Sequence, residues 1–164
     1  MLVLLGKQST GKTQTLKALI GRLKQFQQFK CVDDLPVKDA PDDRLLIFTT
    51  TAPSGREVKV AVLTAGDAEG IIKENLDACL DAKADIIVCA CRTKNGNPVW
   101  KACLEFAKAG GYTPICLGHF HICHFVRDNK FPMQELLPAF NGHNADALLD
   151  ALLHIINDNE SKEE

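Results

Sequence analysis

Gly6-Lys7-Gln8-Ser9-Thr10-Gly11-Lys12-Thr13 is the stretch on which the predicted fold rests, and it matches the phosphate-binding pattern G-x-x-x-x-G-K-[ST] at every defined position. A loop that wraps a polyphosphate turns its backbone N–H groups inward, and the two glycines permit that close approach. Lys12 then reaches the β- and γ-phosphates, and the Thr13 hydroxyl can ligate the Mg²⁺ ion that bridges them. We therefore predict that Gly6 to Thr13 bind the phosphates, that Lys12 also acts in catalysis, and that Thr13 is a metal ligand.

The sequence on both sides of this loop predicts the elements that such a loop requires. Residues 1–5 are apolar and predict a short buried strand that leads into it. A helix is predicted directly after it, because apolar residues recur at helical spacing at Leu16, Leu19, Ile20, Leu23 and Phe26. With this strand, loop and helix the chain resembles the P-loop NTPase superfamily, and no closer family is indicated. The resemblance implies the three-layer P-loop NTPase fold.

Beyond the first helix, strand-like and helical segments alternate along the chain. This order predicts an α/β fold with a mostly parallel sheet and helices on both faces. Residues 45–51 and 58–64 flank the turn Ala52-Pro53-Ser54-Gly55 and predict one antiparallel hairpin within the sheet. The length of 164 residues fits one P-loop NTPase domain, which we assign to residues 1–158, with a frayed acidic tail at 159–164.

Local patterns predict several boundaries. Residues 29–34 predict a short strand, and residues 35–44, which contain two prolines and several aspartates, predict a surface loop. Asn144 is predicted to cap the last helix. Trp100 occupies a regular apolar position of another helix and is expected in the core.

Parallel sheets bind ligands at the carboxyl ends of their strands. Four segments follow predicted strands and are expected to converge there, namely residues 6–13, 33–34, 64–67 and 92–97. Arg92 is predicted to stabilise the charge that develops on the transferred phosphoryl group, with Arg127 as the second candidate. For both arginines, a solvated surface charge is the alternative.

Phosphoryl transfer also needs an acid that positions the metal ion. The second motif of the superfamily is an apolar strand that ends in Asp, but Leu63 stands at that place and Asp67 follows four positions later. Asp67 is therefore predicted to act in catalysis and to bind the metal, with a helix N-cap as its alternative role. Asp33 and Asp34 are predicted as catalytic from a similarity of position to an acid of small-molecule P-loop kinases. Their alternative role is to form a turn.

A GTPase is the second class of enzyme that the sequence suggests. Thr64-Ala65-Gly66 resembles the Asp-Thr-Ala-Gly turn of translation-factor-type and Ras-like GTPases, and the preceding hairpin fits that arrangement. However, Leu63 replaces the leading acid of that turn. Thr93-Lys94-Asn95-Gly96 also lacks the final acid of the guanine-reading Asn-Lys-x-Asp motif. We therefore expect ATP rather than GTP.

A cluster of histidine and cysteine raises the question of zinc. On a strand, His119, His121 and Cys123 would share one face, and their side chains suit zinc. A structural zinc site needs a fourth ligand, and the sequence has no C-x-x-C pair to supply it. The alternative is that the histidines pack beside a ligand cleft.

Composition narrows the class of protein further. A formal net charge of −2 gives no strong signal for nucleic-acid binding, which usually shows a basic stripe. No apolar run approaches the length of a membrane span. The seven cysteines are odd in number and scattered, which favours a reduced, cytoplasmic protein.

The sequence thus predicts a small cytoplasmic protein that binds Mg-ATP. It would transfer the γ-phosphoryl group to an unidentified acceptor, as a kinase does, or hydrolyse ATP. The alternatives are a GTPase-like switch and a non-catalytic, nucleotide-gated interaction module that lost its acid at Leu63.

Overall fold

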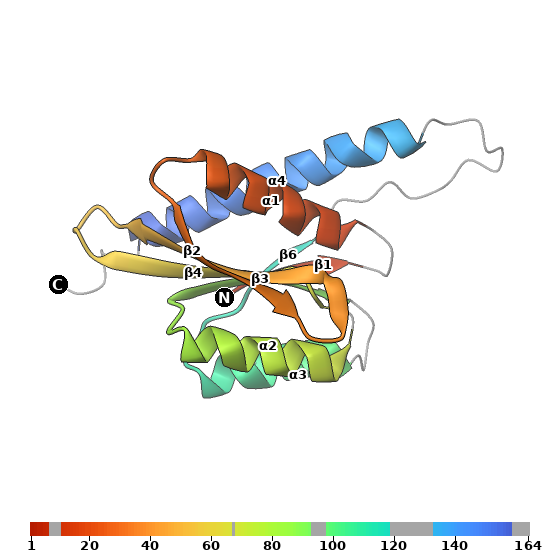
Figure 1. Ribbon diagram of the computed structural model, residues 1–164, viewed down its shortest axis with the longest axis horizontal. Coiled ribbons are helices and arrows are strands. Elements are labelled where there is room, and N and C mark those ends of the chain that lie inside the picture. The colour runs from red at the N-terminus through yellow and green to blue at the C-terminus, as the bar shows by residue number, and fades with distance from the viewer. Residues whose placement is uncertain (7–10, 67, 93–97, 119–132, 159–164) are drawn as a thin grey trace.

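Six strands in the described part of the chain form one sheet, in the order β2-β3-β4-β5-β1-β6 (Figure 1). The computed structural model describes residues 1–6, 11–66, 68–92, 98–118 and 133–158, and of 133–136 only the backbone. The predicted tail at 159–164 lies outside the described residues.

The strands next to the glycine-rich loop are parallel. Strand β1 (Leu2–Gly6) pairs in parallel with β5 (Ile86–Arg92) on one side and with β6 (Ile115–Gly118) on the other. Strand β4 (Glu57–Leu63) pairs in parallel with β5. The prediction of an α/β fold with a mostly parallel sheet is confirmed.

Strand β3 (Ala40–Thr51) runs antiparallel to β4, as the sequence predicted. The turn between them is closed by a 2.8 Å hydrogen bond that the Ala52 N–H donates to the Arg56 carbonyl. Gly55 has a φ of 88°, a left-handed conformation that favours glycine. The predicted hairpin is therefore confirmed.

Residues 35–44 form a second hairpin, so the prediction of a surface loop there is wrong. Strand β2 (Lys30–Val37) pairs antiparallel with β3, and Leu35 lies opposite Leu45. Pro36 is tolerated because β2 is an edge strand, where a missing N–H donor leaves no neighbour unpaired. The prolines and aspartates that suggested a loop are therefore residues of an exposed edge strand and the turn beside it.

Two layers of helices enclose the sheet. Helices α1 (Lys12–Gln25) and α4 (Met133–Asp158) lie on one face, and α2 (Glu69–Asp81) and α3 (Pro98–Ala109) lie on the other (Figure 1). Successive side chains of a strand point to opposite faces of the sheet, so the core consists of two clusters, one on each face. Leu2 and Leu4 pack into the cluster beneath α1 and α4, whereas Val3 packs into the cluster beneath α2 and α3.

Trp100 is half-buried and packs against the cluster beneath α2 and α3. Its expected place in the core is therefore confirmed in part.

Helix α4 begins eleven residues before the predicted cap, so that boundary is wrong. Asn144 lies inside the helix, where its side-chain amide donates a 2.9 Å hydrogen bond to the Phe140 carbonyl. Pro138, Asn141 and Gly142 made this segment look non-helical, because all three disfavour helix interiors. Packing of α4 against α1 overrides these local preferences.

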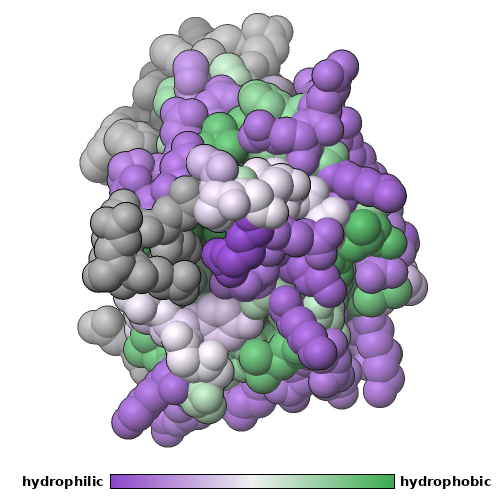
Figure 2. Space-filling view, turned by 90° about the vertical axis from the view of Figure 1, so that its left-hand side faces the viewer, coloured by the Kyte–Doolittle hydropathy of each residue, from purple (hydrophilic) through white to green (hydrophobic). Residues whose placement is uncertain are grey.

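The end of the molecule that carries the β3–β4 turn presents mostly hydrophilic side chains, with hydrophobic ones lying apart from one another (Figure 2). Scattered apolar side chains are ordinary on a protein surface. Among the described residues, no helix combines the length and the apolar character that a membrane span requires. The carboxyl ends of the parallel strands lie at the opposite end of the sheet.

Candidate functional site

The glycine-rich loop joins the carboxyl end of β1 to the start of α1. Gly6 is the last residue of β1, and Gly11 directly precedes α1. Lys7, Gln8, Ser9 and Thr10 lie outside the described residues. The predicted order of strand, loop and helix is thus present.

Gly11 is required at its position for two independent reasons. Its φ is 91°, a conformation that residues with a side chain adopt only under strain. In addition, a Cβ atom added there would lie 2.5 Å from Oδ1 of Asn141 on α4. The second glycine of the motif therefore has both an unusual backbone conformation and a close neighbour.

Lys12 is the first residue of α1 and is 6% exposed. The first turn of this helix contains no acidic residue, so no side chain of its own offsets the positive partial charge at the helix N-terminus. The Lys12 ammonium and the N-terminus of α1, whose first turn carries no acid, both contribute positive potential at this end of the helix. Such a region suits a bound polyanion.

Arg92 lies beside the loop. It ends β5 and stands opposite Gly6 in the register of the β1–β5 pair. This places the predicted phosphate-binding arginine one strand away from the loop, which agrees with the expected convergence. Residues 93–97 and the second candidate, Arg127, lie outside the described residues.

The segment that follows β4 reaches the same edge of the sheet, but β5 separates it from β1. Two strand spacings put the end of β4 about 10 Å from the end of β1. Gly66 passes so close to β5 that an added Cβ atom would lie 2.2 Å from the Ala90 carbonyl oxygen. Asp67 lies outside the described residues.

Asp33 and Asp34 do not join this edge, so their predicted convergence with the loop is wrong. They lie within β2, opposite Ile47 and Leu46, rather than at its end. Three strands separate β2 from β1, which places these acids about 19 Å to the side. Both are exposed, and Asp34 forms an ion pair of 2.7 Å with Arg44.

Asp43, which was predicted to lie in a surface loop, is an acid at the edge of the sheet where β4 ends. Because β3 runs antiparallel to β4, the start of β3 lies beside the end of β4. The buried Thr64 hydroxyl donates a 2.8 Å hydrogen bond to the Asp43 carboxylate and accepts another of 2.8 Å from the Arg44 N–H. The predicted β3–β4 hairpin already contained the signal, because extending its register brings Asp43 close to Thr64.

Three buried thiols lie in the core cluster beneath α2 and α3, Cys89 and Cys91 on β5 and Cys103 on α3. A hydrogen bond with Cys103, together with burial, raises the pKa of Cys91, although the nearby Lys12 ammonium opposes the rise. A hydrogen bond with Cys89 raises the pKa of Cys103. Cys91 and Cys103 are therefore neutral, and all three buried side chains pack as small apolar groups.

Within the described part of the chain, no group of three histidine, cysteine or acidic side chains is arranged to hold a metal ion. The cluster considered for zinc, His119, His121 and Cys123, lies outside that part. It therefore remains a prediction from the sequence.

Polar contacts join α1 to α4 beside the loop. The Thr15 hydroxyl donates a 3.3 Å hydrogen bond to Oδ1 of Asn141. Farther along the helices, the Arg22 guanidinium donates to Asp146 and, over 3.1 Å, to the Gly142 carbonyl. The hydrogen bond from Arg22 holds the pKa of Asp146 below its usual value. Sequence reasoning missed Asn141, because its partner Thr15 lies 126 residues away in the chain.

The geometry thus brings together the two ends of the loop, Lys12, Arg92 and the segment after β4, and it excludes Asp33 and Asp34. Comparison with known proteins adds no further constraint. No protein-family model matches the chain, and neither a curated protein nor a solved structure matches it.

Proposed function

We propose that the chain is a small nucleotide-binding protein of the P-loop NTPase type that holds Mg-ATP at Gly6 to Thr13. The observation that carries the proposal is the buried Lys12 at the first position of a helix whose first turn contains no acidic residue. A triphosphate supplies the negative charge that this position suits. The backbone angle of Gly11 agrees with a loop that turns its N–H groups inward.

The residues at the site suit the phosphates and Mg²⁺. Mg²⁺ usually takes only one or two protein oxygens beside phosphates and waters, and the Thr13 hydroxyl can be one of them. Lys12 and Arg92 supply positive charge for the phosphates. The bound ion would neutralise charge on the β- and γ-phosphates. Asp67 stays the predicted acid. Asp43 is a further candidate, because it lies at the edge of the sheet where β4 ends.

The proposed reaction is phosphoryl transfer to an acceptor or to water. A binding module without turnover is the second candidate, and one observation favours it. The strand beside β1 ends in Cys91 and Arg92, so this adjacent position carries no carboxylate. Release of phosphate or ADP from Mg-ATP over hours would exclude the module, and its absence with and without candidate acceptors would exclude the enzyme.

Thermal unfolding with and without millimolar Mg-ATP tests the proposal. A ligand at a hundred times its dissociation constant adds about 2.7 kcal/mol to the free energy of unfolding. For a chain of this size that raises Tm by about 5–10 °C. We expect this rise for the wild type and its loss in Lys12→Ala.

Lys101→Ala is the matched control, because Lys101 is a lysine on α3 whose side chain is 78% exposed. It should keep the full rise in Tm. A wild type that shows no shift with either Mg-ATP or Mg-GTP would contradict the proposal. A larger shift with Mg-GTP would favour the GTPase-like alternative.

The double variant Asp33→Asn/Asp34→Asn should bind Mg-ATP as tightly as the wild type, because these acids lie about 19 Å from β1. Exposed ion pairs contribute about 0–1 kcal/mol, so the stability of the variant should change little. The measurement is the rise in Tm with Mg-ATP, which should equal that of the wild type within about 1 °C. If Mg-ATP did not raise the Tm of the double variant, Asp33 and Asp34 would have to belong to the binding site.

A further inference from the structure

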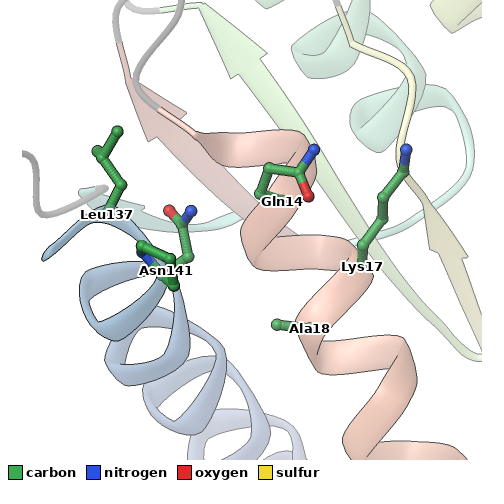
Figure 3. A pocket seen from close by; sticks show the side chains of 6 residues that line it. Gln14, Lys17, Ala18, Leu137 and Asn141 are labelled. Carbon is green, nitrogen blue, oxygen red and sulfur yellow. The ribbon is translucent and has the colours of Figure 1, made fainter. Parts of the chain in front are cut away.

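A groove of about 570 Å³ opens between α1 and α4 (Figure 3). Its volume falls within the range of small-molecule sites. It is lined by Gln14, Lys17, Ala18, Leu137, Pro138 and Asn141. Figure 3 shows the α1 residues on one side of the groove and Leu137 and Asn141 on the other.

The side-chain amide of Asn141 points to a ligand. Asn141 is 9% exposed, and its Oδ1 accepts the hydrogen bond from Thr15. Among the described residues, its amide nitrogen has no hydrogen-bond partner. Buried polar groups are nearly always paired, so a buried amide N–H that lines a groove calls for a partner from outside the chain.

The rest of the lining suits a flat, partly apolar group. Ala18, Leu137 and Pro138 offer apolar surface. Leu137 is 39% exposed, although it is a large apolar side chain. Binding sites for heteroaromatic rings combine such apolar walls with a few polar groups that fix orientation.

The groove reaches Gly11 at the end of the glycine-rich loop, because Asn141 lines the groove and its side chain lies against Gly11. A ligand whose phosphates lie at the loop could therefore extend directly into the groove. Only a ligand that joins phosphates to a ring would use both parts.

We propose that the groove binds the adenine nucleoside of the triphosphate, an inference that rests on the proposed function. An asparagine amide pairs its donor and acceptor with N7 and the N6 amino group of adenine. Guanine presents two acceptors, N7 and O6, to the same amide, so one contact is lost. Oδ1 has a second lone pair, which lets it accept from adenine while it accepts from Thr15.

The test is isothermal titration calorimetry with the Mg²⁺ complexes of ATP, GTP and inorganic tripolyphosphate. In the wild type we expect ATP to bind at least about tenfold more tightly than tripolyphosphate, and about 5- to 150-fold more tightly than GTP. Tripolyphosphate reports on the loop alone, because it has no nucleoside.

Ala18→Leu fills the groove without removing a polar group. It should raise the Kd of ATP about tenfold or more and leave that of tripolyphosphate unchanged within about twofold. Ala147→Leu is the matched control, because Ala147 is exposed on α4 and does not line the groove. It should bind all three ligands as the wild type does.

Asn141→Ser removes the amide without adding volume and serves as a second variant if Ala18→Leu does not fold. It should reduce the preference for ATP over GTP to within about twofold and leave tripolyphosphate binding intact.

The outcomes separate the two proposals. Unchanged ATP binding in Ala18→Leu, with tripolyphosphate still bound, overturns the groove and leaves the phosphate site standing. A wild type that binds neither ATP nor tripolyphosphate overturns the proposed function itself. Equal binding of ATP and GTP by the wild type overturns the assignment of adenine.

Discussion

Gly66→Ala is expected to lower the free energy of unfolding by about 3 kcal/mol or more, at the upper end of the cost of overpacking. The added Cβ atom would lie 2.2 Å from the Ala90 carbonyl oxygen, which is a backbone atom and cannot rotate away. Relief would require the end of β4 to move away from β5. Since natural domains are stable by about 5–15 kcal/mol, this is a large fraction of the total.

Urea unfolding followed by circular dichroism measures the effect of Gly66→Ala. The matched control is Gly70→Ala, because an added Cβ atom at Gly70 meets nothing within 4 Å. Gly70 lies in the first turn of α2, so alanine should cause no loss and up to about 1 kcal/mol of gain. Equal stability of the two variants would show that the chain after β4 does not pass over β5 as described.

Gly11→Ala is expected to be the second most damaging change, because strain and overlap add. The left-handed backbone costs a residue with a side chain about 1–2 kcal/mol. Asn141 must also move away from the new Cβ atom, which disrupts its hydrogen bond with Thr15. We expect a total loss of about 2–3 kcal/mol and a fall in Tm of about 4–12 °C.

Two variants separate the causes of the effect of Gly11→Ala. Gly21→Ala lies in the same helix with nothing within 4 Å, and it should stabilise the protein by about 0.5–1 kcal/mol. The double variant Gly11→Ala/Asn141→Ala should be less destabilised than the sum of its single variants, because the overlap then disappears. Strict additivity in this cycle would contradict the contact between Gly11 and Asn141.

The sequence was most informative where each signal is local. Strand β1, the glycine-rich loop and helix α1 follow one another directly, and buried residues at regular spacing mark both elements. The β3–β4 hairpin likewise combines a turn with two apolar strands. In these segments one face is buried, so apolar residues recur in the sequence at the spacing of a helix or a strand.

The segments that were predicted wrongly lack such a period. All but the last residue of β2 are exposed, so nothing required apolar residues to alternate and the strand looked like a loop. The first part of α4 contains Pro138 and Gly142, and its helical state depends on packing against a helix more than a hundred residues earlier. Single-sequence patterns carry little information about such long-range support.

At the candidate site, too, the positions of residues with local sequence signals were predicted correctly, and those of residues placed by long-range contacts were not. Lys12 and Arg92 were placed from their own surroundings, because each directly adjoins a clear strand or helix. Asp43 required the register of a hairpin, and Asn141 required the packing of two helices. Asp33 and Asp34 were misplaced because the direction of β2 cannot be read from β2 alone.

The pairing of β1 bears on how the molecule is synthesised. Both neighbours of β1, β5 and β6, are translated at least 80 residues after it, and α4, which packs on α1, follows β6. Domains fold as units during translation, which proceeds at about 5–20 residues per second. The nascent chain therefore carries its glycine-rich loop for many seconds before the strands that hold it exist. A ribosome-bound chain that ends before α4 should consequently lack the finished site, even though every residue of the loop has already been made.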